Sequence, residues 1–471
     1  MSTVRTPAVR TPLRDRNAVV LGLGLTGLSL ARHLLGEGAR VRVADTRSEP
    51  PLAGKLRAFA PDVAIACGPF DHATLAGADL VAISPGIAKD DAPIAAAAGR
   101  GVEIVGDVEL FARALPAGER VLAITGSNGK TTVTALTGAL CRAANLDTVV
   151  AGNIGDPVLD VLAEMRSRQR WPDVIVLELS SFQLETTSSL APVAATVLNV
   201  TENHLDRYDG MEAYAAAKAR IFAGAGLQVL NRDDRRSMAM HRSGRVVETF
   251  GRGMPALEKE WGLIARPDDG RAVWLARGGQ LLLPIRALRL VGEHNALNAL
   301  AALALVSAVA PIRKEVLGAL AAFEGLPHRM QRVAEIDGVL YVNDSKGTTV
   351  AATEVALAGL GRPVVLIAGG DGKGQDFSAL RAAVGTHCRA VLLIGRDAPA
   401  IERALQGTTT RLEMCGTLDA AVVRAKALAG PGEVVLLSPA CASLDQFGNY
   451  VERGERFMAL VGSGRPEVAH A

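Results

Sequence analysis

A glycine-rich segment at residues 126–132 has the residue types that bind nucleotide phosphates. It follows the apolar run 121–125 and precedes a stretch, 133–140, that is typical of a helix. Glycines let backbone N–H groups approach an anion, a lysine adds positive charge, and a neighbouring hydroxyl can bind Mg²⁺. The general nucleotide-binding pattern requires glycine where Ile124 stands, so this is a shortened version, and an ordinary turn with a solvated lysine is the alternative. We predict a phosphate-binding loop made of Gly126, Ser127, Asn128, Gly129, Lys130, Thr131 and Thr132.

Further polar residues follow later apolar runs. Glu178 ends the run 173–177, where nucleotide-binding folds place a carboxylate for Mg²⁺. His204 follows the run 194–200, and its position leaves metal or substrate contact and an ordinary histidine equally open. Lys218 lies among alanines in a predicted helix over 211–222, and periodicity alone favours a solvated lysine. Asn295 and Asn298 lie three residues apart at the start of another helix, where asparagine is also a common cap.

The N-terminal part contains a second glycine-rich turn. Gly22, Gly24 and Gly27 match G-x-G-x-x-G after the apolar run 17–21, and Asp45 ends the next run. This geometry binds the pyrophosphate of a dinucleotide or of a nucleoside diphosphate, and a turn without a ligand uses the same residues. The segment 84–86, Ser-Pro-Gly, ends another strand at the edge of the sheet where ligands of α/β proteins bind.

Three α/β units must position these residues. Apolar strands alternate with helical stretches along the 471 residues, which predicts parallel sheets and, at roughly 150 residues per domain, about three domains. We expect a disordered leader at 1–16, a Rossmann-like domain at 17–111, a central ATPase-type domain at 112–325 and a Rossmann-like C-terminal domain at 326–471. The central domain is expected to contain a small antiparallel insertion at about 235–290.

Composition excludes several functional classes. Lysine and arginine (51) nearly balance aspartate and glutamate (49), so no basic surplus favours nucleic acid. Five scattered cysteines without C-x-x-C spacing are typical of a reducing compartment. No apolar stretch is long enough to predict a membrane span. We expect a soluble, cytoplasmic protein that is a monomer.

Seven further motifs accompany the phosphate loop. They lie at Glu178–Glu185, Asn203–Tyr208, His294–Asn298, Pro327–Arg329, Asn343–Thr348, Gly369–Gly374 and Ser438–Phe447. Together with the loop they resemble the Mur ligase family over roughly residues 17–460. The resemblance implies an ATP-dependent, amide-forming ligase that adds D-glutamate to UDP-N-acetylmuramoyl-L-alanine through an acyl phosphate, in peptidoglycan precursor synthesis. L-glutamate is the alternative amino acid.

The resemblance also implies a role for each matching residue, with ATP and Mg²⁺ as cofactors. Catalysis would use Lys130, Lys218, His204 and Glu178. Thr131, Glu178, His204 and a carbamylated Lys218 would hold metal ions, while Asn295, Asn298, Arg329 and Asp344 would bind ATP along with the phosphate loop. The UDP-substrate would contact Gly24, Leu25, Thr26, Asp45, Thr46, Arg47, Ser84, Pro85, Gly86, Asn153, Ser180 and Ser181. Glutamate would contact Lys346, Thr348, Lys373, Ser443 and Tyr450.

Three other functions compete with this interpretation. A folylpolyglutamate synthase shares the shortened loop but does not explain the N-terminal unit. An NAD-dependent oxidoreductase would explain the N-terminal glycines but neither the phosphate loop nor the C-terminal lysines. A nucleotide-binding scaffold without activity would bind ATP but release no phosphate when an amino acid is added.

Overall fold

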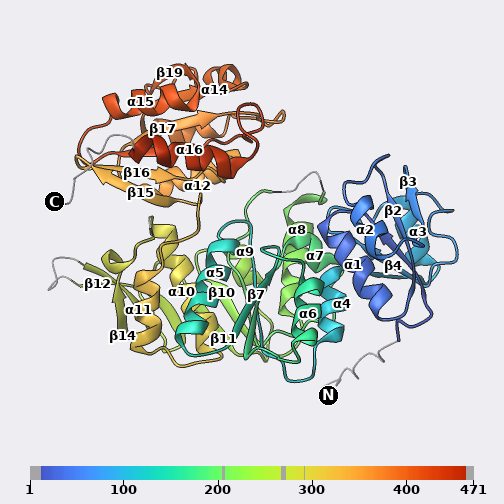
Figure 1. The fold of residues 1–471 in the computed structure, drawn as a ribbon. Helices are drawn as coiled ribbons and strands as arrows, with labels where there is room; N and C mark the ends of the chain where they lie inside the picture. Colours follow the sequence, from blue (N-terminus) through green and yellow to red (C-terminus); the bar gives the residue numbers. More distant parts are fainter. Residues whose placement is uncertain (1–11, 204–206, 267–271, 291, 463–471) are drawn as a thin grey trace, which may run out of the picture. The chain divides into compact units, whose positions relative to one another are not determined.

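The computed structural model describes residues 12–203, 207–266, 272–290 and 292–462 (Figure 1). The chain divides into two compact units, Met1–Trp261 with Ala301–Val316, and Gly262–Leu300 with Leu317–Ala471. Each unit is built from helices alternating with mostly parallel strands, which confirms the predicted α/β class.

The N-terminal sheet has five parallel strands in the order β3-β2-β1-β4-β5. They are β1 (Asn17–Leu21), β2 (Arg40–Asp45), β3 (Ile65–Cys67), β4 (Leu80–Ile83) and β5 (Glu103–Val105), joined through α1 (Leu25–Gly36), α2 (Ala53–Phe59) and α3 (Ala92–Gly99). Successive residues of β1 pack into two different apolar clusters, one with Leu28 and the other with Ile94. Because both faces are covered, the central strands β1 and β4 are apolar except for Asn17 at the start of β1.

Residues 12–16, which we expected to belong to a disordered leader, are part of the described structure. Asp15 donates its backbone N–H to the Gly38 carbonyl at 2.9 Å, and Arg16 forms an ion pair with Glu103 at 2.7 Å. Tertiary contacts of this kind leave no trace in local sequence composition. Residues 1–11 lie outside the described part of the chain.

The central sheet has nine strands in the order β14-β13-β12-β11-β10-β9-β6-β8-β7. They are β6 (Val121–Thr125), β7 (Thr148–Gly152), β8 (Val174–Glu178), β9 (Ala194–Val197), β10 (Leu227–Asn231), β11 (Val247–Phe250), β12 (Glu260–Arg266), β13 (Ala272–Arg277) and β14 (Gln280–Pro284). The accompanying helices are α4 (Asp107–Ala114), α5 (Lys130–Ala143), α6 (Val158–Ser167), α7 (Ser181–Glu185), α8 (Gly210–Ala219) and α9 (Arg235–Ala239).

The predicted antiparallel insertion is only partly antiparallel. β13 and β14 form the expected hairpin, but β11 pairs parallel with both β10 and β12. The helix α9 lies between β10 and β11, and a crossover that contains a helix joins parallel strands. The segment therefore continues the central sheet.

The C-terminal sheet has six strands in the order β15-β16-β20-β17-β18-β19. They are β15 (Gln331–Ile336), β16 (Val339–Asn343), β17 (Val364–Gly369), β18 (Cys388–Ile394), β19 (Arg411–Gly416) and β20 (Val434–Leu437). The helices α10 (Glu293–Ser307) and α11 (Lys314–Ala322) precede it, followed by α12 (Val350–Leu360), α13 (Leu380–His387), α14 (Ala398–Leu405), α15 (Leu418–Leu428) and α16 (Tyr450–Gly462). The edge strands β15, which is antiparallel to β16, and β19 are not among the predicted strands, because their exposed sides make them less apolar.

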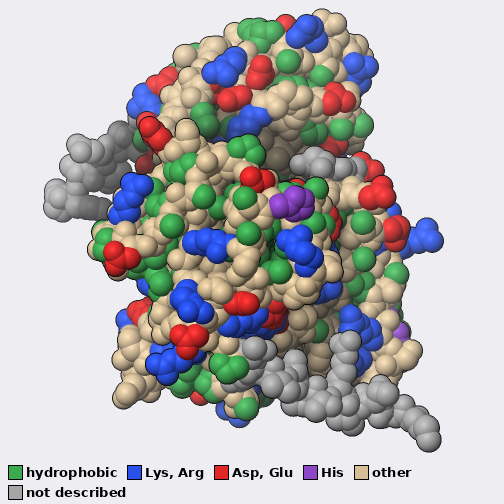
Figure 2. Space-filling view, turned by 90° about the vertical axis from the view of Figure 1, so that its right-hand side faces the viewer, with side chains coloured by type: hydrophobic (Ala, Val, Ile, Leu, Met, Phe, Trp, Pro, Cys, Tyr) green, Lys and Arg blue, Asp and Glu red, His purple; other side chains and the backbone are tan. Residues whose placement is uncertain are grey.

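The surface agrees with the balanced charge of the sequence. On the face drawn in Figure 2, basic and acidic side chains are intermixed and hydrophobic side chains are scattered between them. Within the described residues, no helix combines the length and apolar character that crossing a membrane requires.

Candidate active site

The predicted phosphate loop connects β6 to α5, in the order strand, loop, helix. Gly129 immediately precedes α5 with a φ of 83°, a left-handed conformation that glycine adopts without strain. The first N–H groups of a helix have no partner within it, and the helix dipole makes this end positive. The start of α5 is therefore suited to bind an anion such as phosphate.

The residues after β9 hold this loop in place. Ser127 donates its backbone N–H to the Asn199 carbonyl at 2.9 Å, and Asn128 donates its own to the Asn199 side-chain oxygen at 2.8 Å. The Ser127 hydroxyl also donates to the Thr201 carbonyl at 3.1 Å. The loop follows β6 and its partners follow β9, and these two strands are paired in the sheet. The hydrogen bonds therefore hold the loop against the neighbouring strand end.

Two lysines share one carbonyl of the loop. The ammonium of Lys130 donates to the Gly126 carbonyl oxygen at 2.9 Å, and Nζ of Lys218 lies 2.9 Å from the same oxygen. Lys218 is 1% exposed. Burial, with a smaller effect of the Lys130 charge, lowers the pKa of Lys218 from 10.5 to about 6. The structure therefore holds a mostly uncharged amine beside the phosphate loop at neutral pH, where the sequence favoured a solvated lysine.

Glu178 lies at the end of β8, the strand next to β6, in register with Ile124. Its side chain is buried, and Asn153 donates to its Oε1 at 2.9 Å. Its Oε2 has no hydrogen-bond partner among the described residues, and an unpaired buried acceptor costs about 1–3 kcal/mol. A hard cation that prefers carboxylate oxygens, such as Mg²⁺, fits this atom. His204, predicted as another metal ligand, lies outside the described residues.

The structure brings the predicted uridine diphosphate residues of the N-terminal domain together. They follow β1, β2 and β4, which are neighbours in the order β2-β1-β4. Asp45 is buried, accepts the Leu23 N–H at 2.7 Å and pairs with Arg47 at 2.6 Å. The hydrogen bond from Arg47 holds the pKa of Asp45 well below its usual range. Asp45 therefore orders the glycine turn and orients Arg47, and its direct contact with the substrate stays a prediction.

Four of the five predicted glutamate residues lie on three loops of the C-terminal domain, and the fifth, Tyr450, begins α16. These loops follow β16, β17 and β20, which are adjacent in the sheet. The N–H of Ala440 donates to the Gly347 carbonyl at 2.9 Å, and Asp371 and Ala442 exchange two backbone bonds of 2.9 Å. The structure thus joins the loops that carry Lys346, Thr348, Lys373 and Ser443 into one surface.

Within this surface, Lys346 and Tyr450 are in contact. Nζ of Lys346 lies 4.0 Å from the centre of the Tyr450 ring, a cation–π distance. Burial, together with the nearby Arg329 charge, lowers the pKa of Lys346. Lys373 is exposed, whereas Ser443 is buried.

The predicted adenosine residues of this unit form two groups. On α10, Asn298 donates to the side-chain oxygen of Asn295 at 2.9 Å, so these two residues act as a pair inside the helix rather than as a cap. After β16, the buried carboxyl group of Asp344 accepts the Ser438 hydroxyl at 2.8 Å and the Met330 N–H at 3.2 Å.

The Asp344 carboxyl group is expected to make stability depend on pH. Burial outweighs its hydrogen bonds and raises its pKa from 3.8 to about 7, so the folded chain binds a proton here that the unfolded chain has released. The contribution of this bound proton to the free energy of unfolding is full below pH 4 and is lost as the pH rises to 7. We expect the melting temperature of the native protein, relative to Asp344→Asn, to fall by a few degrees over this range. The half-buried surface residue Asp419, replaced by Asn, is the control, and a pH-independent difference for Asp344→Asn would contradict the prediction.

Two further residues that contact the candidate site residues were not predicted from the sequence. The Tyr214 hydroxyl lies 3.2 Å from the Ser127 hydroxyl, and its ring centre lies 4.5 Å from Nζ of Lys218. Arg453 is 1% exposed and binds carbonyl oxygens of Ser345, Cys441 and Ala442, which joins two of the glutamate loops. Helical spacing could have found both, because Tyr214 precedes Lys218 by four residues and Arg453 follows Tyr450 by three.

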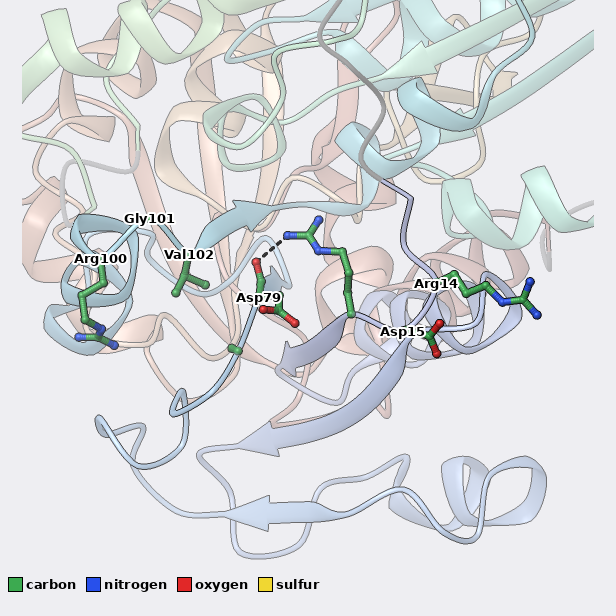
Figure 3. Close-up of a pocket in the computed structure, with 8 residues that line it drawn as sticks. Arg14, Asp15, Asp79, Arg100, Gly101 and Val102 are labelled. Atoms are coloured by element: carbon green, nitrogen blue, oxygen red, sulfur yellow. Dashed lines mark hydrogen bonds between the residues drawn. The ribbon is translucent and has the colours of Figure 1, made fainter.

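A separate hollow lies at the other end of the N-terminal sheet. It encloses about 570 Å³ and is lined by residues 14–16, 78–79 and 100–102 (Figure 3). These residues directly precede β1, β4 and β5, whereas ligands of parallel sheets bind at the carboxyl ends of the strands. The hollow is therefore not part of the candidate site.

Three family models match successive parts of the chain. They describe a MurD-like N-terminal domain of Mur ligases at residues 16–106, the Mur ligase middle domain at 124–306 and the Mur ligase glutamate ligase domain at 328–441.

Similar proteins cover nearly the whole chain. UDP-N-acetylmuramoylalanine–D-glutamate ligases of Methylobacillus flagellatus and Thiobacillus denitrificans are 55% and 53% identical to it, over 95% of this chain and 97% and 96% of their own. The MurC structure of Thermotoga maritima is 19% identical with a TM-score of 0.55, over 96% of this chain and 100% of its own. E. coli FolC in complex with ADP has the same TM-score at 18% identity, over 76% of this chain and 94% of its own.

These two structural likenesses concern the fold alone. The family models and the two ligases, by contrast, match the chain in sequence along its length. The chain belongs to the Mur ligase family.

Proposed function

We propose that this chain adds D-glutamate to UDP-N-acetylmuramoyl-L-alanine with ATP, as a step of peptidoglycan precursor synthesis. One observation carries the proposal: Lys130 and the buried Lys218 both contact the carbonyl oxygen of Gly126 in the phosphate loop. The chain belongs to a family of ATP-dependent ligases. Relatives more than half identical over 95% of the chain carry the name of this reaction, which favours D-glutamate over L-glutamate. We also propose that the chain acts as a cytoplasmic monomer, with domain boundaries near residues 112 and 326.

The reaction has two steps. The alanyl carboxylate oxygen attacks the γ-phosphorus of ATP, the bond from this phosphorus to the β–γ bridging oxygen breaks, and ADP leaves. The glutamate amine then attacks the acyl carbon, loses a proton and expels phosphate. Negative charge develops on the transferring phosphoryl group, so cations and N–H donors must be in place around it beforehand. Lys130, the start of α5 and the hydroxyl groups of Thr131 and Thr132 are proposed for this role.

Magnesium would supply charge neutralisation for the ATP phosphates. The unpaired Oε2 of Glu178 supports a role as metal ligand, with Thr131 at the start of α5 and His204 as further proposed ligands.

We propose that Lys218 carries a carbamate. Only an uncharged amine attacks carbon dioxide, and burial keeps this amine mostly uncharged at neutral pH. The new N–C bond and the loss of a proton convert the neutral amine into an anion. An anionic Lys218 would attract the Lys130 ammonium, which binds the same carbonyl, and could contact a metal ion.

The other proposed contacts divide by substrate. Lys346 and Lys373 would pair with the two carboxylates of glutamate, and Thr348, Ser443 and Tyr450 would complete that site. The adenosine and phosphates of ATP would contact Asn295, Asn298, Arg329 and Asp344. The uridine diphosphate would contact the N-terminal loops, and the sugar-peptide would contact Asn153, Ser180 and Ser181.

A folylpolyglutamate synthase is the nearest alternative. The likeness to the FolC structure covers 76% of this chain. The Mur ligase models, by contrast, begin at residue 16 and so include the N-terminal domain. The NAD-dependent alternative is weakened as well, because Asp45, the expected ribose ligand, already binds Leu23 and Arg47.

Phosphate release tests the proposal. The protein is supplied with ATP, Mg²⁺ and UDP-N-acetylmuramoyl-L-alanine, and D-glutamate, L-glutamate and no amino acid are compared. We expect release only with D-glutamate, and a product heavier by one glutamyl residue in mass spectrometry. Release with L-glutamate alone would reverse the stereochemical assignment. Release with neither would reject the proposed substrates.

A further inference from the structure

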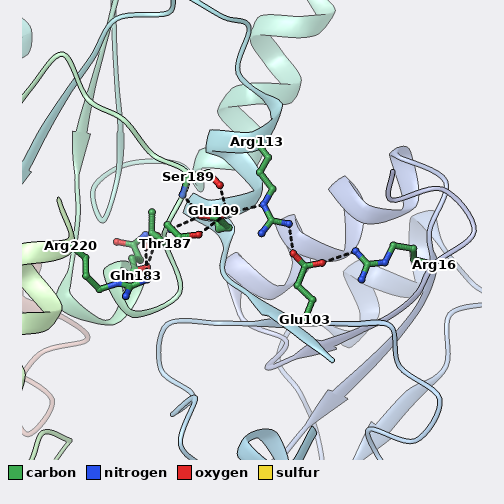
Figure 4. A network of polar contacts seen from close by, with 9 residues as sticks. Arg16, Glu103, Glu109, Arg113, Gln183, Thr187, Ser189 and Arg220 are labelled. Atoms are coloured by element: carbon green, nitrogen blue, oxygen red, sulfur yellow. Dashed lines mark hydrogen bonds and ion pairs between the residues drawn. The ribbon is translucent and has the colours of Figure 1, made fainter. Parts of the chain in front are cut away.

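Helix α4 carries two buried carboxylates that none of the proposed substrate contacts uses. Asp107 and Glu109 are 2% and 1% exposed. The helix follows β5, the edge strand of the N-terminal sheet, and both carboxylates contact the segment 183–189 around and after α7. Figure 4 shows Glu109 beside Ser189 of this segment.

Glu109 binds the end of this segment. It accepts the backbone N–H groups of Ser188 and Ser189 at 2.6 and 2.9 Å, and the Ser189 hydroxyl at 2.6 Å. Arg113 donates to it from the same helix at 2.8 Å. Burial acts to raise the pKa of Glu109, but these hydrogen bonds outweigh it and lower the pKa. The carboxylate is therefore charged at neutral pH and holds two successive backbone groups of the middle domain.

Asp107 binds the beginning of α7 through Gln183. The Gln183 side chain donates to Asp107 at 3.3 Å, and its oxygen accepts the N–H of Ser180 at 3.1 Å. The Ser180 hydroxyl in turn accepts the Gln183 N–H, which completes a capping box. A helix of five residues is too short to be stable by itself. Its position must therefore come from these contacts and from its apolar packing.

A chain of ion pairs extends from Glu109 back into the N-terminal domain. Arg113 donates to Glu103 of β5 at 2.5 Å, and Arg16 donates to the other oxygen of Glu103 at 2.7 Å. Arg16 also donates to the Asp79 carbonyl just before β4 at 2.7 Å (Figure 3). The segment after α7 is thereby connected to three adjacent strands, β1, β4 and β5, of the sheet whose opposite end carries the uridine diphosphate loops.

We propose that Glu109, assisted by Asp107, is a positioning residue that holds α7 in a fixed place relative to the UDP-binding domain. The inference rests on the proposed function in one respect, that Ser180 and Ser181 contact the sugar-peptide. The nucleotide end of the substrate then binds one domain and its peptide end binds α7. Glu109 and Asp107 set the distance between the two, so that both ends of one substrate bind together.

The variant Glu109→Gln tests this role because it keeps the size of the side chain and removes its charge. We expect the KM for the UDP-substrate to rise about tenfold or more, because displaced contacts weaken binding, while the KM for ATP changes less than about twofold. Hydrogen exchange at the Ser188 and Ser189 amides should become faster. The control is Glu164→Gln, because Glu164 is an exposed glutamate paired with Arg168 on the surface. It should change neither of the two KM values nor the exchange of the Ser188 and Ser189 amides.

Ser189→Ala is the second variant, for the case that Glu109→Gln does not fold. It removes one of the donors to Glu109 and keeps the backbone bond, so we expect a smaller change in the same direction. Equal increases in both KM values, or an unchanged KM for the UDP-substrate with unchanged amide exchange, would overturn the proposal. If the unaltered protein releases no phosphate with the UDP-substrate, the proposed function fails. The amide exchange still decides whether Glu109 holds the segment after α7.

Discussion

Replacing Lys218 by alanine is expected to lower kcat by about two to three orders of magnitude, similar to the loss of one preorganised charge-stabilising group. The proposed carbamate would place a negative charge next to Lys130, and alanine removes it. The exposed Lys314→Ala is the matched control and should retain full activity. Full activity of Lys218→Ala would exclude an essential role for this lysine.

The modification itself can be observed directly. Protein equilibrated with ¹³C-bicarbonate should give a carbamate carbon signal in NMR that is absent from Lys218→Ala. Acetate should restore part of the activity of the alanine variant, because a small carboxylate can occupy the space of the missing group. The absence of both effects would leave Lys218 as a neutral buried amine and contradict the carbamate.

For the unmodified Lys218 amine, the direction in which stability changes with pH can be stated. The pKa of Lys218 is about 6 in the folded chain and near 10.5 when exposed, so between these values the unfolded chain binds more protons. The contribution to stability is therefore full above pH 10.5 and decreases as the pH falls to 6. Lys218→Met should lack this dependence in bicarbonate-free buffer, as measured by thermal unfolding. Carbamate formation should likewise decrease below about pH 6, where the amine becomes protonated.

The second large effect is expected for Glu178→Gln. The amide can still accept the hydrogen bond from Asn153, but it replaces the unpaired carboxylate oxygen with a neutral group. We expect the Mg²⁺ concentration for half-maximal phosphate release to rise about tenfold or more, and kcat to fall by about two orders of magnitude. ATP binding measured without Mg²⁺ should be unchanged.

The control for this variant is Glu212→Gln, because Glu212 is largely exposed on α8. Both variants are first treated with a chelator, and phosphate release is then measured as a function of the Mg²⁺ concentration. An unaltered Mg²⁺ requirement in Glu178→Gln would remove this residue from the metal site.

Much of the candidate site could be predicted because its signals are local. The phosphate loop is recognisable from a strand, two glycines, a lysine and a helix within about twenty residues, and the structure has these elements in that order. The loops after β16, β17 and β20 lie at one edge because the carboxyl ends of parallel strands meet there. The strands β10, β12, β15 and β19 were not predicted.

The sequence by itself determined the α/β class, the alternation of elements and the identity of most proposed site residues. The tertiary structure decided their chemical state and their partners. Burial lowers the pKa of Lys218 to about 6, at a position beside a carbonyl 92 residues earlier. Glu109 binds amide groups about 80 residues later. Periodicity reports which face of an element is buried, whereas a pKa or a hydrogen bond depends on atoms that only the order of strands in the sheet brings together.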